Sequence, residues 1–195
     1  MVLGMHAIDI WLFDWLNASV HSPQWLVDAT VLYSEYFPTL AISTMLVCLV
    51  FGSRRLRQGM AMCLVAMLLA WCATHLIRWG FPMERPYEMG LGDKWIEHGA
   101  RPRFPSLHAT VSFAFASGIS LWCATGTAAR HWKLLVWTVA ALMGWSRVYV
   151  GVHLPFDILS GLVVGIACVY AVQALRAPVT SLGKSAAYWI RRAGP

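Results

Sequence analysis

Histidine, arginine and carboxylate side chains gather in three short stretches of an otherwise apolar chain. The first runs from Arg78 to Arg85-Pro86, the second is Pro105-Ser106-Leu107-His108, and the third runs from Ser146-Arg147 to Asp157 and includes His153. Guanidinium groups bind phosphate oxygens bidentately, and an imidazole that is oriented by a carboxylate can act as a nucleophile. Together these residue types predict a site for a phosphate group.

Two of these stretches are expected to lie at the N-termini of helices. Pro105 and Ser106 precede an apolar segment, so Ser106 is a candidate N-cap that could also bind an anion, and simple capping is the alternative. Pro155 suits the first turn of a helix, which places His153 just before that helix and Asp157 in its first turn. A hydrogen bond from one ring nitrogen of His153 to Asp157 would leave the other nitrogen free to attack.

The composition predicts the elements that must position these residues. The chain has 195 residues, of which 58% are hydrophobic and only 12% charged, and its mean hydropathy is +0.59. An average soluble domain is about 45–50% apolar and about 25% charged. The composition therefore excludes an ordinary soluble domain and a disordered chain, and it predicts an all-α integral membrane protein.

Apolar segments of membrane-spanning length predict a bundle of about five to six transmembrane helices. Four of these segments are clear spans. A fifth, shorter segment, Leu134–Ser146, is long enough to cross the membrane if it continues through Arg147 to Val150. The N-terminal segment, 1–24, alternates apolar and acidic residues at helical spacing and is expected to lie along the membrane interface. We interpret 1–195 as one domain, with a helical core over 28–175 and a cytoplasmic tail over 176–195. The four clearest spans are Tyr36–Ser53, Gln58–Ile77, Ala109–Ala129 and Ile158–Leu175.

The positive charges predict how the bundle is oriented. Cytoplasmic loops are enriched in Lys and Arg, and nine of the fifteen such residues fall at alternate turns and in the tail: Arg54, Arg55, Arg57, Arg130, Lys133, Arg176, Lys184, Arg191 and Arg192. The other six lie opposite, with all nine Asp and Glu residues. This places the N-terminus outside and the C-terminus inside, so that all three polar stretches face outward.

The spacing of the three stretches resembles the signature of the type-2 phosphatidic acid phosphatase (PAP2) superfamily. The signature reads Arg78-x6-Arg85-Pro86, then Pro105-Ser106-x-His108, then Ser146-Arg147-x5-His153-x3-Asp157. The resemblance implies a metal-independent phosphatase that acts on a lipid phosphate or diphosphate. It also implies that His153 is a nucleophile that becomes a phosphohistidine, that Asp157 orients it, and that His108 protonates the leaving group. The residues that would bind the phosphoryl oxygens are Arg78, Arg85, Ser106 and Arg147.

Two positions depart from the family pattern. Arg78 stands where most members have Lys, which keeps the charge. Leu107 stands where most members have Gly, a residue that permits a left-handed backbone or a close approach to phosphate. Within the superfamily the sequence is most similar to the bacterial undecaprenyl-diphosphatase, or bacitracin-resistance, group, in which Asp often occupies the Leu107 position.

The resemblance predicts hydrolysis of undecaprenyl diphosphate at the outer face of the bacterial cytoplasmic membrane. The alternatives within the superfamily are phosphatases for phosphatidylglycerophosphate, phosphatidic acid or lipid A, and the alternative outside it is an anion channel or lipid transporter. No cofactor, metal or nucleic-acid partner is expected, and membrane lipids surround the bundle. Gly161 and Gly165 form a GxxxG pair that could serve a homodimer, although close packing within the bundle is the simpler interpretation.

Overall fold

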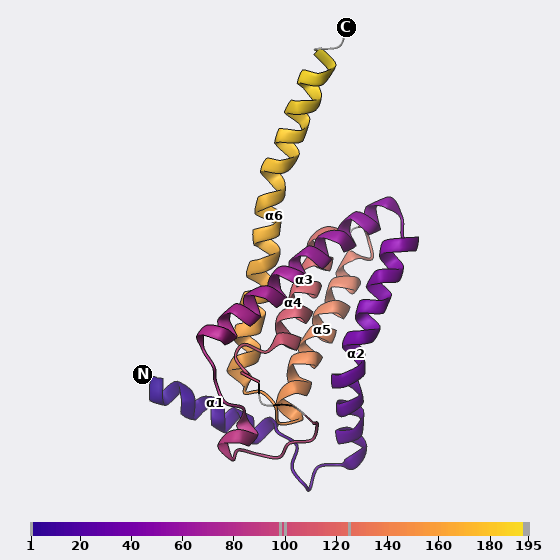
Figure 1. Ribbon diagram of the computed structural model, residues 1–195. Coiled ribbons are helices and arrows are strands. Elements are labelled where there is room, and N and C mark those ends of the chain that lie inside the picture. Colours follow the sequence, from indigo (N-terminus) through magenta and orange to yellow (C-terminus); the bar gives the residue numbers. More distant parts are fainter. Residues whose placement is uncertain (1, 98, 100, 125, 193–195) are drawn as a thin grey trace.

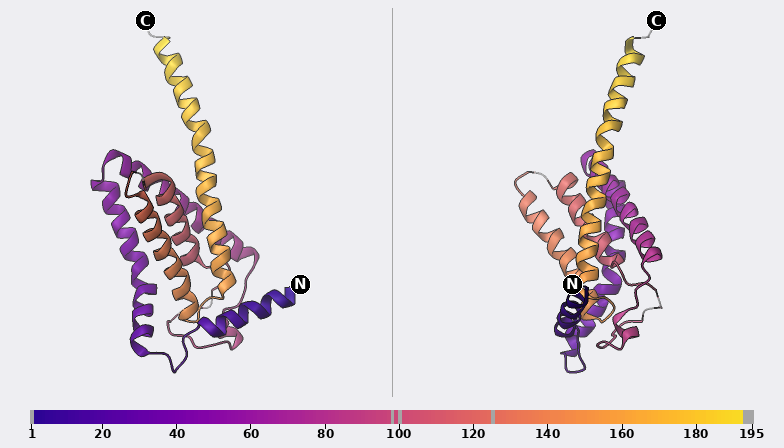
Figure 2. Two further views of the ribbon diagram at one scale, coloured as in Figure 1. Left: turned by 180° about the vertical axis from the view of Figure 1, so that it is seen from behind. Right: turned by 90° about the vertical axis from the view of Figure 1, so that its left-hand side faces the viewer.

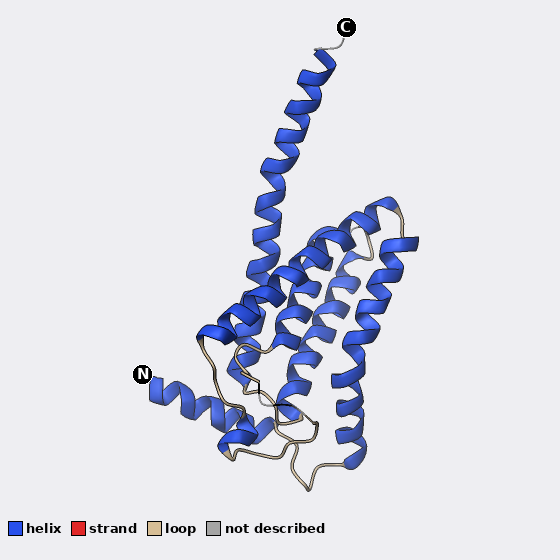
Figure 3. Ribbon diagram, viewed as in Figure 1, coloured by secondary structure: helices blue, strands red, loops and turns tan. Residues whose placement is uncertain are grey.

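The described part of the chain is helical throughout. The computed structural model describes residues 2–97, 99, 101–124 and 126–192, and Figure 3 shows helices and loops but no strand in this part of the chain. This confirms the predicted all-α class. The helices are α1 (Val2–Leu16), α2 (Gln24–Phe51), α3 (Arg54–Gly80), α4 (Leu107–Gly118), α5 (Ala129–Tyr149) and α6 (Pro155–Arg192), with a short 3₁₀-helix η1 (Pro86–Met89) and a π-helix η2 (Ile119–Cys123).

Three helices are long and apolar enough to cross a membrane. They are α2, α3 and the Pro155–Arg176 part of α6, and Leu107–Cys123 forms a shorter apolar helix. Figure 1 shows α4 and α5 running alongside these three helices in a single bundle. The chain is therefore a membrane protein with a helical bundle, as the composition predicts.

Several predicted boundaries shift because a helix does not stop where an apolar run stops. α2 begins at Gln24, well before the predicted Tyr36, because Asp28 and Glu35 interrupt the apolar run without breaking the helix. The span predicted over Ala109–Ala129 widens into the π-helix η2 and ends at Cys123. α6 continues past Leu175 to Arg192 as one helix (Figure 2), and the last three residues of the predicted tail, 193–195, lie outside the described residues.

One end of the bundle collects the three polar stretches. At this end α3 finishes, α4 and α6 begin, α5 finishes, and the connection 81–106 crosses between α3 and α4 (Figure 1). α1 lies crosswise at the same end in all views. Its Ile8, Trp11 and Trp15 side chains are exposed, whereas Asp9 and Phe13 are buried against the bundle.

Small residues let α6 pack closely on α4. A Cβ atom added at Gly165 would lie 2.5 Å from the carbonyl oxygen of Thr110 and 2.9 Å from the amide nitrogen of Ala114, and one added at Gly161 would lie 3.0 Å from the amide nitrogen of Thr110. The GxxxG pair therefore faces α4 of the same chain, which is the simpler of its two interpretations. This close packing fixes the start of α6 beside the start of α4, where two of the polar stretches lie.

Replacing Gly165 with Ala should destabilise the bundle, because the new methyl group meets backbone atoms that cannot move aside. Overpacking of this kind costs about 1–3 kcal/mol, which lowers the melting temperature by several degrees in a thermal unfolding experiment on the purified protein. The matched control is Gly80→Ala at the end of α3, where an added Cβ meets nothing within 4 Å. Equal melting temperatures for the two variants would contradict the packing described here.

Candidate active site

The seven residues that the sequence singles out lie at the same end of the bundle, and six of them are buried. His108 is half-buried on the first turn of α4. The electrostatic neighbours of His153 include Arg78, Arg85, Arg147 and His108, so the structure brings the three stretches together. The buried members are Arg78, Arg85, Ser106, Arg147, His153 and Asp157, each at most 8% exposed.

His153 and Asp157 form a buried pair at the start of α6. The Nδ1 atom of His153 lies 3.2 Å from Oδ2 of Asp157, and the same carboxylate oxygen accepts a hydrogen bond of 2.9 Å from the backbone amide of Leu154. Because this carboxylate oxygen already acts as an acceptor toward the Leu154 amide, we treat it as the acceptor for His153 too and assign the proton to Nδ1 of His153. With this assignment the Nε2 atom carries a lone pair.

Burial and positive neighbours keep the His153 imidazole neutral. The pKa of His153 is lowered well below its usual 6.5, chiefly because the ring is removed from water and also because Arg85, Arg147 and Arg78 are close. A neutral imidazole is the form that can act as a nucleophile. Burial likewise lowers the pKa of Arg85, with Arg103 as a smaller cause of the same sign.

Arg78 and Arg85 hold the connection between α3 and α4 by its carbonyl groups. Nε and Nη2 of Arg78 donate to the Pro105 carbonyl at 3.1 and 2.8 Å, and Nη2 also donates to the Arg103 carbonyl at 3.3 Å. Arg85 donates from Nε to the Arg101 carbonyl at 3.0 Å and from Nη1 to the Val152 carbonyl at 2.8 Å. All these acceptors are neutral, so neither guanidinium charge is compensated by them.

Two buried polar atoms at the site have no hydrogen-bond partner among the described residues. Ser106 stands at the N-cap of α4, as predicted, but its side chain makes no capping hydrogen bond, and its Oγ atom is unpartnered. The Nε atom of Arg147 is also unpartnered, while Nη1 of Arg147 donates to Oγ of Ser34. Unsatisfied buried polar atoms are rare and costly, so both atoms are consistent with a site for an oxygen-rich anion.

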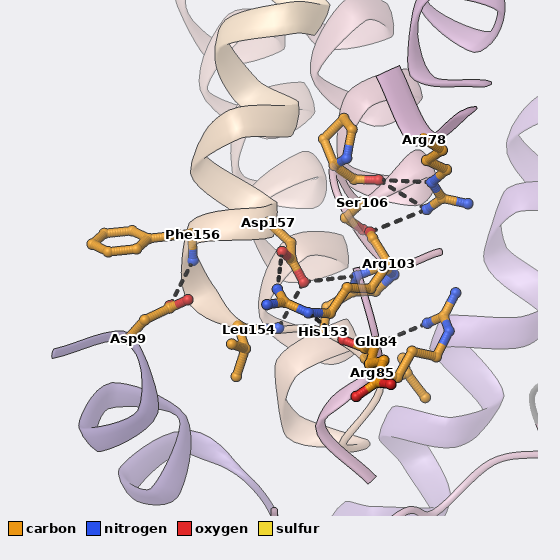
Figure 4. Close-up of polar contacts among 12 residues, drawn as sticks. Asp9, Arg78, Glu84, Arg85, Arg103, Ser106, His153, Leu154, Phe156 and Asp157 are labelled. Atoms are coloured by element: carbon orange, nitrogen blue, oxygen red, sulfur yellow. Dashed lines mark hydrogen bonds and ion pairs between the residues drawn. The ribbon is translucent and has the colours of Figure 1, made fainter. Parts of the chain in front are cut away.

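Arg103 is a fourth buried guanidinium that the sequence analysis did not select. Figure 4 shows Arg103 reaching Asp157, and its Nη1 atom donates to Oδ1 of that carboxylate in an ion pair. Nε of Arg103 also donates to the Glu84 carbonyl. No spacing rule links positions 103 and 157, so only the folded connection could reveal this contact.

Asp9 of α1 is a second residue that the sequence analysis did not select. It is one of the acidic residues of segment 1–24, yet it is 4% exposed, and its Oδ1 atom accepts a hydrogen bond of 2.9 Å from the Phe156 amide (Figure 4). This amide belongs to the first turn of α6, where backbone donors lack partners within the helix. Asp9 therefore fixes the turn that carries Asp157.

The turn between α5 and α6 depends on a glycine. Gly151 has a φ of 80°, a left-handed value that disfavours other residues, and an added Cβ would collide with the Asp93 carbonyl oxygen. Asn17, which follows α1 directly, joins this turn to the connection 81–106, because its Nδ2 atom donates to the carbonyls of Tyr149 and Asp93 at 3.0 Å each. The backbone leading to His153 is thus held by Asn17 and by the connection 81–106.

Leu107 and His108 connect the polar site to an apolar cavity. The cavity has a volume of about 470 Å³, lies among α2, α3, α4 and α5, and includes both residues in its wall. Leu107 is the first residue of α4, and no described residue other than glycine has a positive φ. The backbone at this position therefore does not require the glycine that most family members have.

The signature residues fall within a match to a protein-family model. Residues 59–180 match the model of the PAP2 superfamily. The chain belongs to the PAP2 superfamily. The PAP2 superfamily is a phosphatase family, and the match confirms the resemblance seen in the signature.

Relatives of this PAP2 protein include two bacterial proteins named for one substrate. YbjG of Escherichia coli (strain K12), a provisionally named undecaprenyl-diphosphatase, is 32% identical over 170 residues, which cover 84% of this chain and 81% of YbjG. The undecaprenyl-diphosphatase BcrC of Bacillus subtilis (strain 168) is 26% identical over 155 residues, which cover 80% of this chain and 77% of BcrC. The predicted similarity to the undecaprenyl-diphosphatase group is confirmed.

Two crystal structures share the fold of this PAP2 protein. LpxE of Aquifex aeolicus superposes with a TM-score of 0.69 at 21% identity, covering 84% of this chain and 93% of LpxE. A transmembrane PAP2-type phosphatidylglycerolphosphate phosphatase from Bacillus subtilis superposes with a TM-score of 0.72 at 16% identity, covering 90% of this chain and 88% of that protein. At these identities the likeness establishes the fold alone.

Replacing Asp9 with Ala should destabilise this PAP2 protein, because the Phe156 amide loses its acceptor. Loss of an N-cap acceptor typically costs about 1 kcal/mol, which thermal unfolding of the purified variant can detect. The matched control is Asp14→Ala on the same helix, because Asp14 is exposed. If Asp14→Ala lowers the melting temperature as much as Asp9→Ala does, the cap is not the cause.

The His153 ring should stay neutral in the folded protein as the pH falls below about 6.5, the usual histidine value. In the unfolded chain the same ring binds a proton there, so the unfolded state takes up more protons and stability falls as the pH falls. Nitrogen NMR of histidine-labelled protein measures this, with the His153 signal identified by its loss in His153→Gln. Protonation of that signal at or above pH 6.5 would contradict the prediction.

Proposed function

We propose that this protein is a metal-independent lipid phosphatase that hydrolyses undecaprenyl diphosphate to undecaprenyl phosphate through a phosphohistidine. The observation that carries the proposal is the charge arrangement around His153. Three guanidinium groups whose hydrogen-bond partners are neutral lie near a neutral imidazole, and among the described residues neither Nε of one of them, Arg147, nor the buried Ser106 hydroxyl has a partner. A phosphate group supplies the negative charge and the acceptor oxygens that this arrangement lacks.

In the proposed first step, Nε2 of His153 attacks the terminal phosphorus atom. The bond from that phosphorus to the bridging oxygen breaks, and undecaprenyl phosphate leaves as His108 donates a proton to it. Arg78, Arg85, Arg147 and the Ser106 hydroxyl stabilise the transferring phosphoryl oxygens, and Asp157 stabilises the charge that develops on the ring. Positioning and electrostatic stabilisation supply most of the catalysis in phosphoryl transfer.

In the proposed second step, His108 acts as a base toward water. The water oxygen attacks the phosphohistidine, the phosphorus–nitrogen bond breaks, and inorganic phosphate is released with His153 restored. A phosphohistidine divides one difficult displacement into two easier ones. Among the described residues no group of three His, Cys, Asp or Glu side chains is placed to hold a metal ion, and the proposal requires none.

The apolar cavity beside His108 supports a lipid as the leaving group. A chain in this cavity would enter from between the helices while its phosphates reach the arginines at the end of the bundle. The two relatives named undecaprenyl-diphosphatases favour a polyprenyl chain. The phosphatidylglycerolphosphate phosphatase that shares the fold makes that phospholipid the second candidate.

We also propose the location. The site lies at the end of the bundle opposite the basic turns Arg54–Arg57 and Arg130–Lys133. Because cytoplasmic loops are enriched in basic residues, the site faces the outside of a bacterial cytoplasmic membrane. An undecaprenyl diphosphate in the outer leaflet could reach it without crossing the bilayer.

Phosphate release by the purified protein, with excess EDTA present, tests the proposal. The panel contains undecaprenyl diphosphate, phosphatidic acid, phosphatidylglycerophosphate and lipid A, and we expect the first to be the best substrate. His153→Ala should abolish turnover, and Arg85→Lys should lose about 10- to 100-fold because a charged hydrogen bond contributes about 1.5–3 kcal/mol. Arg54→Lys, at an exposed position of α3, is the control.

Three results would contradict this function. Full turnover by His153→Ala would refute the nucleophile, and loss of activity in EDTA that Mg²⁺ restores would refute a metal-independent reaction. Lipid movement across vesicles without release of phosphate would favour the transporter alternative.

A further inference from the structure

The middle of α2 borders the apolar cavity instead of packing against protein. Phe37, Pro38 and Ala41 are among its residues in the cavity wall. The buried residues of α2 lie on either side of this stretch, since Val27, Thr30 and Ser34 precede it and Met45 follows it. α2 is therefore held by packing at both ends of the cavity and has little protein support between them.

A proline weakens α2 at the site end of this unsupported stretch. Pro38 lies inside the helix and has no amide hydrogen, so the carbonyl group four residues earlier, that of Ser34, loses its helical hydrogen bond. The turn from Ser34 to Pro38 is thus a weak point in the backbone of α2. Ser34 is the last buried residue of α2 before this weak point.

Ser34 contacts one of the arginines of the candidate site. Its Oγ atom accepts a hydrogen bond from Nη1 of Arg147, and both side chains are buried, at 0% and 2% exposure. Among the described residues the Arg147 guanidinium makes this one hydrogen bond, and its Nε atom has no partner. Ser34 therefore sets the rotation of the guanidinium and leaves Nε available to an anion.

We propose that α2 couples the lipid chain to the phosphate group, with Ser34 as a positioning residue for Arg147. A hydrocarbon chain in the cavity packs against the unsupported stretch of α2. This packing holds Ser34 against Arg147 and fixes the guanidinium in the direction that binds phosphate. The inference rests on the proposed function, in which the cavity takes the lipid chain and Arg147 binds a phosphoryl oxygen.

Such coupling must act in both directions. A chain that orders α2 reduces the ordering that a phosphate must bring about, so each ligand raises the affinity for the other. The two parts of a lipid phosphate can be supplied separately to test this. Farnesol provides a prenyl chain without phosphate, and orthovanadate provides a phosphate mimic without a chain.

The experiment measures inhibition of para-nitrophenyl phosphate hydrolysis by orthovanadate, with and without farnesol, using the full chain purified in digitonin. The rigid sterol body of digitonin is a poor mimic of a flexible chain. In the wild type, farnesol should lower the inhibition constant of orthovanadate by about 5-fold or more, the low end of typical coupling between sites. In Ser34→Ala the change should be less than about 2-fold.

Three further variants of α2 make the result specific. Ser43→Ala should respond to farnesol as the wild type does, because Ser43 is exposed on α2 and is not part of the cavity wall. Ser34→Thr, which retains the hydroxyl group, should restore the response. Ser34→Cys keeps the volume with a weaker acceptor and should lose the response, so it replaces Ser34→Ala if that variant does not fold.

The outcomes separate this inference from the proposed function. No effect of farnesol on the wild type, or an equal effect on Ser34→Ala, would overturn the coupling while hydrolysis and its inhibition remain normal. Failure of the proposed function would instead appear as a wild-type protein that releases no phosphate from either para-nitrophenyl phosphate or undecaprenyl diphosphate.

Discussion

Buried positive charge without a matching negative charge is the constraint on which the rest of this structure depends. Arg78, Arg85, Arg103 and Arg147 are all at most 8% exposed, and Arg103 pairs with the Asp157 carboxylate. Removing a charge from water is costly unless a partner compensates for it. The other three guanidinium groups donate to neutral carbonyl and hydroxyl oxygens, and among the described residues the Nε atom of Arg147 has no partner at all, so these bonds leave the positive charges uncompensated. A bound phosphate would supply what is missing.

The same arginines also build the site that they would serve. Arg78 and Arg85 bind carbonyl groups of the connection between α3 and α4 and of the turn before His153. These bonds draw three segments, far apart in sequence, around one small volume. The site is thereby organised before any substrate arrives, and preorganised donors are the most effective form of electrostatic stabilisation.

Two helices outside the PAP2 signature complete this arrangement. α1 lies across the end of the bundle and supplies Asp9 to the first turn of α6, and α2 supplies Ser34 to Arg147. Both helices also present large exposed apolar side chains, among them Trp11 on α1 and Leu40 on α2. In a membrane these surfaces contact lipid, so the lipid environment and the buried charges are linked through very few residues.

The sequence by itself determined the class of fold and the core of the site. Long apolar runs require helices in a membrane, because backbone groups there must be satisfied within the segment. The spacing of Arg78, Arg85, His108, His153 and Asp157 was sufficient to predict the PAP2 family, and Pro155 marked the start of α6. These features depend on local pattern, so they can be read from neighbouring residues.

Only the tertiary structure decided the contacts of Arg103, Asp9 and Ser34 and the existence of the cavity beside His108. Each of these contacts joins positions more than fifty residues apart, and residues of four different helices line the cavity. No periodicity or motif records which distant side chains meet, because that depends on how whole helices pack. The boundaries of α2 and α6 differ from the sequence prediction for a related reason: a helix extends past the hydrocarbon layer wherever its backbone hydrogen bonds can continue.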